Sequence, residues 1–284
     1  MPPIPRAPLR VAAVQAEPNP GDVAGNAALA ARLASRAAGD GARLVVLSEL
    51  FLPGYHPPTL RADPAGTHIA ADEAGKVGDI RLDRLRAVAR EQQIVIVASA
   101  AVLHRDGRRT ISVLVVDRRG AVTCAYDKQY LWNAEERALF TAGGPGATLA
   151  VDGWWLGLSI CPDASFPEHA QAAADDSAHG YLCLGAYPEG SQHRRDLQSA
   201  ARAMDNMMYV VVANQVGGPS PWRFTGGSAI YEPEGRPLRR APDFGEHVII
   251  ADFDPDELAR VRAARQMLDD RRSDLDTQRR LCRG

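Results

Sequence analysis

Short aliphatic runs alternate with longer alanine-rich or amphipathic segments along most of the chain. The run 44–47 is entirely aliphatic and ends in polar residues, which is typical of a strand buried on both faces. Asp22 can cap the alanine-rich helix that ends at the glycines of 39–41. The same reasoning predicts strands at residues 9–16, 44–47, 94–102, 111–117, 121–126, 148–151, 154–160, 181–185, 209–214, 228–232 and 247–253. It predicts helices at about 22–38, 82–92, 167–175 and 192–206, and a charged C-terminal tail that is helical in part.

The order of these elements mixes hairpins with strand–helix–strand units. This mixture favours an α/β fold with layered sheets over a plain doubly wound sheet. The chain has 284 residues, more than most single domains, but large α/β folds reach this length around one core. Since no internal repeat or long linker divides the sequence, we expect one domain over residues 1–284.

Composition narrows the possible function. The formal net charge is −2, so no overall positive field is available to hold nucleic acid or anionic lipid. No apolar run approaches the ~20 residues needed to cross a bilayer. Residues 1–8 are proline-rich and lack the apolar centre of a secretory signal. We therefore expect a cytoplasmic protein that binds neither nucleic acid nor membrane.

The cysteines and lysines are both rare. Four cysteines are widely spaced with no C-x-x-C pair, which indicates reduced thiols rather than a disulfide framework or a zinc site. Lys76 and Lys128 are the only lysines, so arginine accounts for nearly all of the 33 lysine and arginine residues. A lysine retained inside an apolar and aromatic segment suggests a need for a compact ammonium.

Three residues that carry chemistry follow predicted buried strands, at points where the chain turns. They are Glu49, Lys128 and Cys161. Taken singly, each has a more common explanation: a solvated loop acid, an exposed lysine and an inert core thiol. Functional groups nevertheless tend to gather at the ends of buried strands in α/β proteins.

The segments around these residues resemble three motifs of the nitrilase (carbon–nitrogen hydrolase) superfamily, in the family order. LSELFLPGY at 47–55 resembles its glutamate motif, and YDKQYLW at 126–132, leading to FTAGG at 140–144, resembles its lysine motif. GLSICPD at 157–163, followed by FPE at 166–168, resembles its nucleophile motif. Further likeness lies at 201–206, 209–214 and 224–230, so the resemblance extends from about residue 9 to the C-terminal region.

This resemblance implies a four-layer α-β-β-α sandwich that is usually dimerised, so we expect a homodimer or a higher homo-oligomer. It implies hydrolysis of a non-peptide C–N bond through a thioester, without a metal or organic cofactor. Cys161 would be the nucleophile, Lys128 would favour the thiolate and bind the oxyanion, and Glu49 would transfer protons.

Two details of the motifs bear on activity. A second family glutamate is best matched by Glu136, which would orient substrate and Lys128, while the adjacent Glu135 is equally well explained as a solvated helix-start acid. The residue after the nucleophile commonly donates its N–H to the oxyanion in this family, but here it is Pro162, which has no N–H. Either Lys128 and another donor compensate, or the oxyanion hole is built differently.

Substrate identity is less strongly indicated. Asp163 resembles the amidase and N-carbamoylase branches rather than true nitrilases, which favours an amide or N-carbamoyl substrate; as a turn carboxylate it would also accept from nearby backbone N–H groups. An arginine near the start of the helix at 192–206 would bind a substrate carboxylate, although a solvated helix face is the more common role for each of His193, Arg194 and Arg195. Trp222 is a further aromatic candidate, although such residues more often belong to a core. The predicted substrate contacts are Tyr55, Trp132, Asp163, Tyr187 and Arg194.

Three alternatives remain open from the sequence. An acyltransferase of the same fold would pass the acyl group to an amine instead of water. A catalytically degenerate binding module is suggested only by Pro162. A redox thiol protein is the weakest alternative, because no resolving cysteine is paired in sequence with Cys161.

Overall fold

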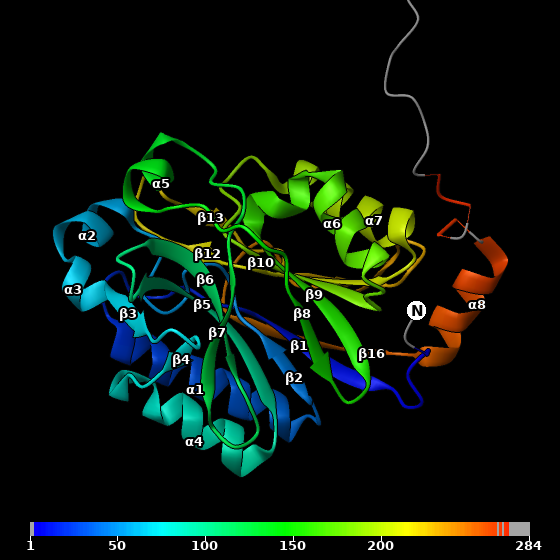
Figure 1. Cartoon of the computed structure of the whole chain (residues 1–284), viewed down its shortest axis with the longest axis horizontal. Coiled ribbons are helices and arrows are strands. Elements are labelled where there is room, and N and C mark those ends of the chain that lie inside the picture. The colour runs from blue at the N-terminus through cyan, green and yellow to red at the C-terminus, as the bar shows by residue number, and fades with distance from the viewer. Residues whose placement is uncertain (1–2, 266, 269, 273–284) are drawn as a thin grey trace, which may run out of the picture.

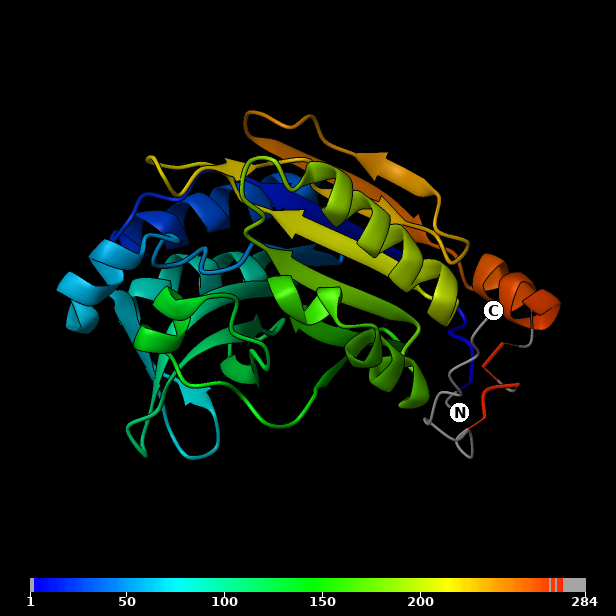
Figure 2. The same ribbon diagram turned by 90° about the horizontal axis from the view of Figure 1, so that it is seen from above.

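Two mixed β-sheets packed face to face form the centre of the molecule (Figure 1, Figure 2). The computed structural model describes residues 3–265, 267–268 and 270–272. Over these residues, the first sheet has the order β16 (His247–Phe253), β1 (Leu9–Gln15), β2 (Leu44–Val46), β5 (Val95–His104), β3 (His68–Ala71), β4 (Lys76–Val77), β7 (Val122–Asp127) and β6 (Arg109–Val116). The second has the order β15 (Pro237–Arg240), β14 (Ala229–Tyr231), β11 (Tyr209–Asn214), β10 (Gly180–Gly185), β9 (Trp154–Ile160) and β8 (Thr148–Val151).

Helices cover the outer face of each sheet. The helices α1 (Val23–Gly39) and α4 (Asp83–Gln92) pack on the first sheet, and α6 (Pro167–Asp175) and α7 (Gln192–Asn206) pack on the second (Figure 1). The predicted four-layer α-β-β-α sandwich is therefore confirmed. The C-terminal helix α8 (Pro255–Arg265) lies at one end of the layers (Figure 1).

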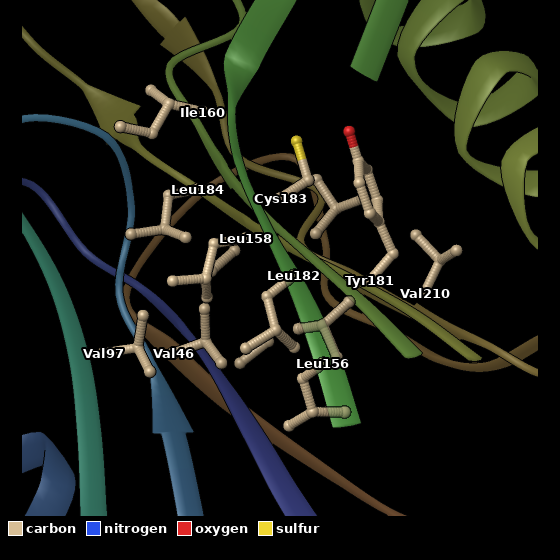
Figure 3. Close-up of a cluster of buried hydrophobic side chains, with 14 of the residues drawn as sticks. Val46, Val97, Leu156, Leu158, Ile160, Tyr181, Leu182, Cys183, Leu184 and Val210 are labelled. Atoms are coloured by element: carbon tan, nitrogen blue, oxygen red, sulfur yellow. The ribbon is translucent and has the colours of Figure 1, made fainter. Parts of the chain in front are cut away.

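The alternation of side chains along β1 explains how one strand serves two layers. Leu9, Val11 and Ala13 belong to the core between the sheets, whereas Ala12 and Val14 belong to the core beneath α1. Successive strand residues point to opposite faces, so a continuously apolar strand must be buried on both. The same inter-sheet core brings Val46 and Val97 of the first sheet toward Leu156, Leu158, Leu182 and Leu184 of the second (Figure 3).

The parallel strands bring distant segments to one edge. β1, β2 and β5 run parallel in the first sheet, and β9, β10 and β11 run parallel in the second. Glu49 lies shortly after β2, and Cys161 follows β9 directly. Since the carboxyl ends of parallel strands lie on one side of a sheet, this topology sets the base and the thiol near each other.

All the predicted strands and helices are present, most with ends shifted by no more than two residues. The helix α1 begins after Asp22, whose carboxylate accepts from Gly25 N at 2.8 Å as expected of a cap. Several short elements were not predicted from the sequence: α2 (Pro57–Ala62), α3 (Pro64–Thr67), α5 (Ala134–Leu139), β3, β4, β12 (Val216–Gly217), β13 (Phe224–Thr225) and β15. Residues 273–284 of the predicted tail lie outside the described residues. Within the described part, no helix is long and apolar enough to cross a membrane.

Candidate active site

Glu49 is held at the junction of the two sheets. Its backbone N–H donates to Gly185 O at 3.3 Å, which ties the segment after β2 to the end of β10. The next residue, Leu50, adopts a left-handed φ of 46°, so the chain turns away directly after the carboxylate. The Glu49 side chain is completely buried, and its Oε2 has no hydrogen-bond partner within the described residues.

Lys128 follows β7 and is also completely buried. Its Nζ lies 2.5 Å from Glu49 Oε1, and 2.9 and 2.7 Å from the two carboxylate oxygens of Glu136. Its backbone N–H donates to Ile111 O at 2.8 Å, continuing the pairing of β7 with β6. The ammonium is therefore enclosed by two carboxylates, which compensate its burial.

The two carboxylates differ in what else they bind. Glu136 Oε1 accepts from the Tyr55 hydroxyl at 2.5 Å, and its Oε2 accepts from Trp132 N at 2.9 Å. Both oxygens of Glu136 are thus engaged, whereas Glu49 keeps Oε2 free. This difference leaves Glu49 as the carboxylate able to exchange a proton, with Glu136 fixing the ammonium.

Cys161 stands at a sharp transition from β9 to the 3-10 turn η2 (Cys161–Ser165). Its φ is 45°, an uncommon conformation for a residue with a side chain. The Tyr187 hydroxyl donates to Cys161 O at 3.0 Å and fixes the main chain at this point. Strained backbone at a single thiol is a feature that often accompanies function.

The electrostatics of the cluster keep the Cys161 thiol protonated in the resting site and make Glu49 a base that titrates near neutral pH. Burial, opposed by the charge of Lys128, raises the pKa of Glu49 to about 7. Burial and the charge of Glu49 raise the pKa of the Cys161 thiol, while Lys128 lowers it. Burial alone would lower the pKa of Lys128, but Glu49 and Glu136 outweigh it and raise that pKa. At neutral pH the site therefore holds a fixed ammonium and a carboxylate poised to accept a proton.

A cavity of about 120 Å³ opens beside the sulfur. Three predicted substrate contacts, Trp132, Tyr187 and Arg194, lie in its wall. Tyr55 does not; its hydroxyl binds Glu136 instead. The residues that line the cavity are Trp132, Cys161, Pro162, Ser165, Ala186, Tyr187, Pro188, Ser191, Arg194 and Gln198.

The placement of Asp163 corrects its predicted role as a substrate contact. It is completely buried and does not line the cavity. Its Oδ2 accepts from Ile160 N at 2.9 Å and from the Tyr126 hydroxyl at 2.7 Å, and its Oδ1 accepts from Tyr130 N at 2.9 Å. Asp163 therefore holds the nucleophile turn against the lysine motif, which agrees with its other predicted role as a turn carboxylate.

A larger surface hollow of about 530 Å³ lies elsewhere and does not include any predicted catalytic residue. Its lining carries several carboxylates but no cysteine or lysine. The smaller cavity is the candidate site, because Cys161 lines it and the buried Glu49 and Lys128 lie close enough to shift the pKa of that thiol. The larger hollow is lined by Glu17, Leu29, Glu189, Val216, Gly217, Arg223, Phe224, Asp243, Phe244, Gly245 and Glu246.

Comparison with known proteins agrees with this geometry. The profile of the carbon-nitrogen hydrolase family matches residues 10–263. The chain belongs to the carbon–nitrogen hydrolase family. A relative from Pseudomonas protegens, described as a hydrolase in the pqqF 5' region, is 32% identical over 268 residues, covering 94% of this chain and 90% of the relative. An (R)-stereoselective amidase from a Pseudomonas species is 30% identical, covering 93% and 92%.

Solved structures of a Nesterenkonia sp. AN1 amidase extend the comparison to the site. One shows Michael addition of acrylamide at the active site cysteine; it has a TM-score of 0.76 and 30% identity, and covers 90% of this chain and 97% of that one. Another, with the same TM-score and identity and coverages of 90% and 95%, contains butyramide. This carbon–nitrogen hydrolase is a cysteine-dependent amidase of the nitrilase superfamily, and its buried Glu49–Lys128 pair is consistent with a catalytic triad of Glu49, Lys128 and Cys161.

Two adjacent arginines of this hydrolase have opposite environments. Arg194 is exposed at the cavity wall, and its side chain makes no hydrogen bond or ion pair among the described residues. Arg195 is buried, and its guanidinium contacts Thr225 Oγ1 at 2.6 Å and Asp196 Oδ1 at 2.9 Å. The expectation of a solvated helix face is therefore wrong for Arg195, which anchors the segment after β13.

Several residues near the thiol were missed or left open by the sequence analysis. Ser165 and Gln198 line the cavity and hydrogen-bond to each other at 3.3 Å. Ala186, directly after β10, lines the cavity with its backbone N–H close enough to the Cys161 sulfur to lower the pKa of that thiol. The sequence did offer a signal for Ala186: it directly follows β10, the parallel neighbour of β9, and therefore lies at the same edge of the sheet as Cys161. Trp222 is not in the wall; its indole N–H donates to Glu135 at 3.3 Å.

Proposed function

We propose that Cys161 attacks a small amide or N-carbamoyl substrate and forms a thioester that water then hydrolyses. The observation that carries this proposal is the arrangement of Glu49 and Glu136 around the buried ammonium of Lys128, close to the Cys161 thiol. Amide carbons are poor electrophiles, so the reaction benefits from a strong nucleophile and a stabilised oxyanion.

In acylation, Glu49 takes the thiol proton while the sulfur bonds to the substrate carbonyl carbon. The carbonyl π electrons move to oxygen, and the Lys128 ammonium stabilises that negative charge. The C–N bond then breaks, and Glu49 passes its proton to the departing nitrogen. Ammonia or an amine leaves, and the acyl group stays on sulfur.

In deacylation, Glu49 takes a proton from water as the oxygen attacks the thioester carbon. The C–S bond breaks, and the proton returns to the thiolate. A carboxylic acid leaves, or a carbamic acid when the substrate is an N-carbamoyl compound. The free Oε2 of Glu49 is the atom suited to both proton transfers, since Oε1 is occupied by Lys128.

The oxyanion hole must work without the residue after the nucleophile, because Pro162 has no N–H. Lys128 supplies one donor. The backbone N–H of Ala186, close to the sulfur and in the cavity wall, is the best placed backbone donor to assist it. The intact cluster argues against a degenerate binding module, although the backbone donor has changed.

The expected substrate is a short acyl amide or N-carbamoyl compound that carries a carboxylate. The cavity is small, and structures of the similar Nesterenkonia amidase were solved in complex with the short amides butyramide and acrylamide. Arg194 adds an unpaired guanidinium to the wall, and a guanidinium binds a carboxylate through two parallel hydrogen bonds.

The decisive experiment is a panel of aliphatic amides, ω-amides, N-carbamoyl compounds and nitriles, assayed for ammonia or amine release. We expect turnover of amides or carbamoyl compounds, none of nitriles, and none with Cys161→Ala. A covalent acyl adduct on Cys161, detected by mass spectrometry after rapid quenching, would support the thioester. Undiminished release by Cys161→Ala would overturn the proposal, and added hydroxylamine would reveal acyl transfer as hydroxamate.

Arg194→Ala tests the carboxylate preference, with Arg194→Lys as the conservative variant. We expect KM for an anionic ω-amide to rise about tenfold or more, as for the loss of a charged hydrogen bond of about 1.5–3 kcal/mol. KM for neutral butyramide should stay unchanged. An equal effect on both substrates would show that Arg194 does not select for charge.

We also propose that the chain forms a homodimer or a higher homo-oligomer. The helix α7 exposes Leu197 and Met204, whose side chains are 62% and 52% exposed in the single chain. Large apolar side chains on one outer helix are suited to an interface. Light scattering on the protein and on Leu197→Glu should show a multimer that dissociates in the variant; a monomeric wild-type protein would refute it.

A further inference from the structure

A second thiol lies in a group of three different metal-binding side chains, away from the cavity. His104 ends β5, and Cys124 and Asp127 lie on β7. His104 Nε2 is 3.1 Å from Asp127 Oδ1, and Cys124 Sγ is 3.7 Å from the same oxygen. The three ligand atoms all lie within 4.8 Å of one another.

These separations fit the size of a tetrahedral metal site. Zn²⁺ binds imidazole nitrogen and carboxylate oxygen at roughly 2.0–2.2 Å and thiolate sulfur at about 2.3 Å, so neighbouring ligand atoms lie about 3.3–3.7 Å apart. The two separations from Asp127 Oδ1 fall at or near this range without any change of backbone. His104 and Asp127 are also reachable, with side chains 16% and 17% exposed.

We propose that His104, Cys124 and Asp127 bind one divalent cation of the Zn²⁺ type, with water as the fourth ligand. Neutral imidazole, thiolate and carboxylate together carry two negative charges, which match the charge of the ion. A neutral complex suits a partly buried position better than an uncompensated charge. This set of nitrogen, sulfur and oxygen ligands favours Zn²⁺ or Co²⁺ over Mg²⁺ or Ca²⁺.

The binding step balances as an exchange of a proton for a metal. The Cys124 S–H bond breaks, the S–M bond forms, and that proton leaves to the buffer, with no change of oxidation state. The His104 ring changes tautomer, losing its proton at Nε2 and gaining one at Nδ1, so the neutral imidazole binds the metal through Nε2. In the metal-free protein, Asp127 Oδ1 accepts hydrogen bonds from Thr110 Oγ1 at 3.0 Å and Ser112 Oγ at 2.6 Å. These hydroxyls can remain as outer partners of the carboxylate.

Arg108 is the group that competes with the ion. Its Nη1 lies 3.7 Å from Asp127 Oδ2, on the oxygen that the proposed site does not use. The guanidinium is 44% exposed and is already paired with Asp106 at 2.7 Å, so it can move away without becoming buried and unpaired. Removing Arg108 should therefore strengthen metal binding rather than abolish it.

The proposed ion would join strands rather than take part in catalysis. It would link the end of β5 to β7, which are separated by β6 in the hydrogen-bonded sheet. Asp127 and Lys128 are consecutive in extended chain, so their side chains point to opposite sides. The other group of potential ligands, Glu232, Glu234 and Glu257, is engaged by arginines and carries no proposal.

Cobalt binding tests the proposal on the full chain with Cys161→Ala and Cys282→Ser, which remove the nucleophile and one other thiol. We expect one Co²⁺ per chain, with a thiolate-to-cobalt charge-transfer band in the near ultraviolet and visible bands typical of four-coordinate Co²⁺. Adding Cys124→Ser should abolish the charge-transfer band, and adding His104→Ala should weaken Co²⁺ binding more than about 100-fold, beyond the usual effect of losing an outer partner.

Matched variants separate this site from other binding. Glu257→Gln, in the second acidic group, should leave the band and the affinity unchanged, and Arg108→Ala should increase the affinity. Zn²⁺ should raise the melting temperature of the variant that carries Cys161→Ala and Cys282→Ser. It should not raise that of the same variant with Cys124→Ser added. Absence of a saturable band, or a band that survives Cys124→Ser, would overturn the proposal.

Discussion

Cys161 and Cys124 lie in separate clusters and show how different surroundings suit a thiol to different chemistry. Burial and a nearby carboxylate raise the pKa of both Cys161 and Cys124, the latter to about 12. Cys161 lies on a strained turn, opens to a cavity and has a buried ammonium beside it. Cys124 lies in β7 next to a shift in the register of its pairing with β6, with an imidazole and a carboxylate as neighbours.

The difference is the source of the positive charge. The site at Cys161 contains its own cation, Lys128, which is held permanently by two carboxylates. Near Cys124 the cation is the partly exposed guanidinium of Arg108, which is paired with carboxylates, and we expect a thiolate there only when a metal ion replaces the thiol proton. A fixed cation favours a nucleophile that must be released in each turnover, whereas a bound metal holds its sulfur as a ligand.

Counting charges also explains why Glu49 titrates near neutrality. With Glu49 and Glu136 both ionised and Lys128 protonated, the buried cluster has a net charge of −1. One added proton makes it neutral, and burial favours the neutral state. Since both oxygens of Glu136 are occupied by donors, Glu49 is the group that takes the proton, and its pKa rises to about 7.

Replacing each thiol separately should give the largest contrast. Cys161→Ala should lower kcat for amide hydrolysis by about 10⁴-fold or more, the scale seen when a catalytic nucleophile is removed. Cys124→Ala should leave kcat within about twofold, because no reacting atom contacts it. Single-turnover assays with purified variants measure both. Equal losses in the two variants would mean that the two thiols do not have separate roles.

Removing the internal cation should cost both activity and stability. Lys128→Met leaves Glu49 and Glu136 buried without compensation, and breaking a buried pair in this way costs about 3–5 kcal/mol of unfolding free energy. Chemical denaturation at pH 8 measures the loss. Lys76→Met, at the exposed second lysine, is the control and should change little.

A double variant distinguishes charge compensation from packing. Lys128→Met combined with Glu136→Gln removes one of the two carboxylate charges that Lys128→Met leaves buried and unpaired. The double variant should therefore recover part of the stability but none of the activity. If the double variant is less stable than Lys128→Met, the loss in the single variant comes from packing around the side chain and not from unpaired carboxylates.

The pH dependence of kcat/KM tests the base. Glu49 must be ionised to accept the thiol proton, and its pKa is raised to about 7, so activity should fall as pH decreases through 7. Below about pH 6 the fall should approach tenfold per unit. Cys124→Ser should give the same profile. A midpoint near 4.5, the ordinary range of a glutamate, would show that Glu49 is not the base in its buried form.

Much of the fold could be predicted because long apolar or amphipathic segments dominate it. The strand at 154–160 and the helix at 192–206 have strong patterns, and their bounds agree with the structure. The short helix α5 (Ala134–Leu139) has too few residues to show a period, although Asn133 caps it through a hydrogen bond to Glu136 N. Tertiary contacts, rather than local pattern, define such elements.

The site was predictable where chemistry and motif coincide, and less so where burial decides the role. Glu49, Lys128 and Cys161 were identified because each follows a predicted strand and lies in a segment that resembles a family motif. Asp163 was predicted to contact substrate, but it is buried in the turn and accepts three hydrogen bonds there. The group of His104, Cys124 and Asp127 was not predicted from the sequence. Its residues come together only through the pairing of β5 and β7 with β6, and their spacing in the sequence does not match a short metal-binding motif.

The smallest expected effect concerns Asp127. Replacing it should weaken the group of His104, Cys124 and Asp127 without changing the site at Cys161. Its Oδ1 accepts from Ser112, Thr110 and His104 at 2.6, 3.0 and 3.1 Å. Asp127→Asn keeps an acceptor oxygen but removes the charge, which reduces hydrogen bonds worth about 1.5–3 kcal/mol to the neutral scale of about 1 kcal/mol. We expect a loss of about 1–2 kcal/mol in unfolding free energy.

Activity then decides whether the two clusters are independent. Lys128 adjoins Asp127, but its position depends on its bonds to Glu49, Glu136 and Ile111 O, none of which involves the Asp127 side chain. Asp127→Asn should therefore keep kcat and the pH midpoint of kcat/KM while it weakens Co²⁺ binding. A shifted pH midpoint would mean that the charge of Asp127 acts across the strand on Glu49, and the thiol clusters would then form one coupled system.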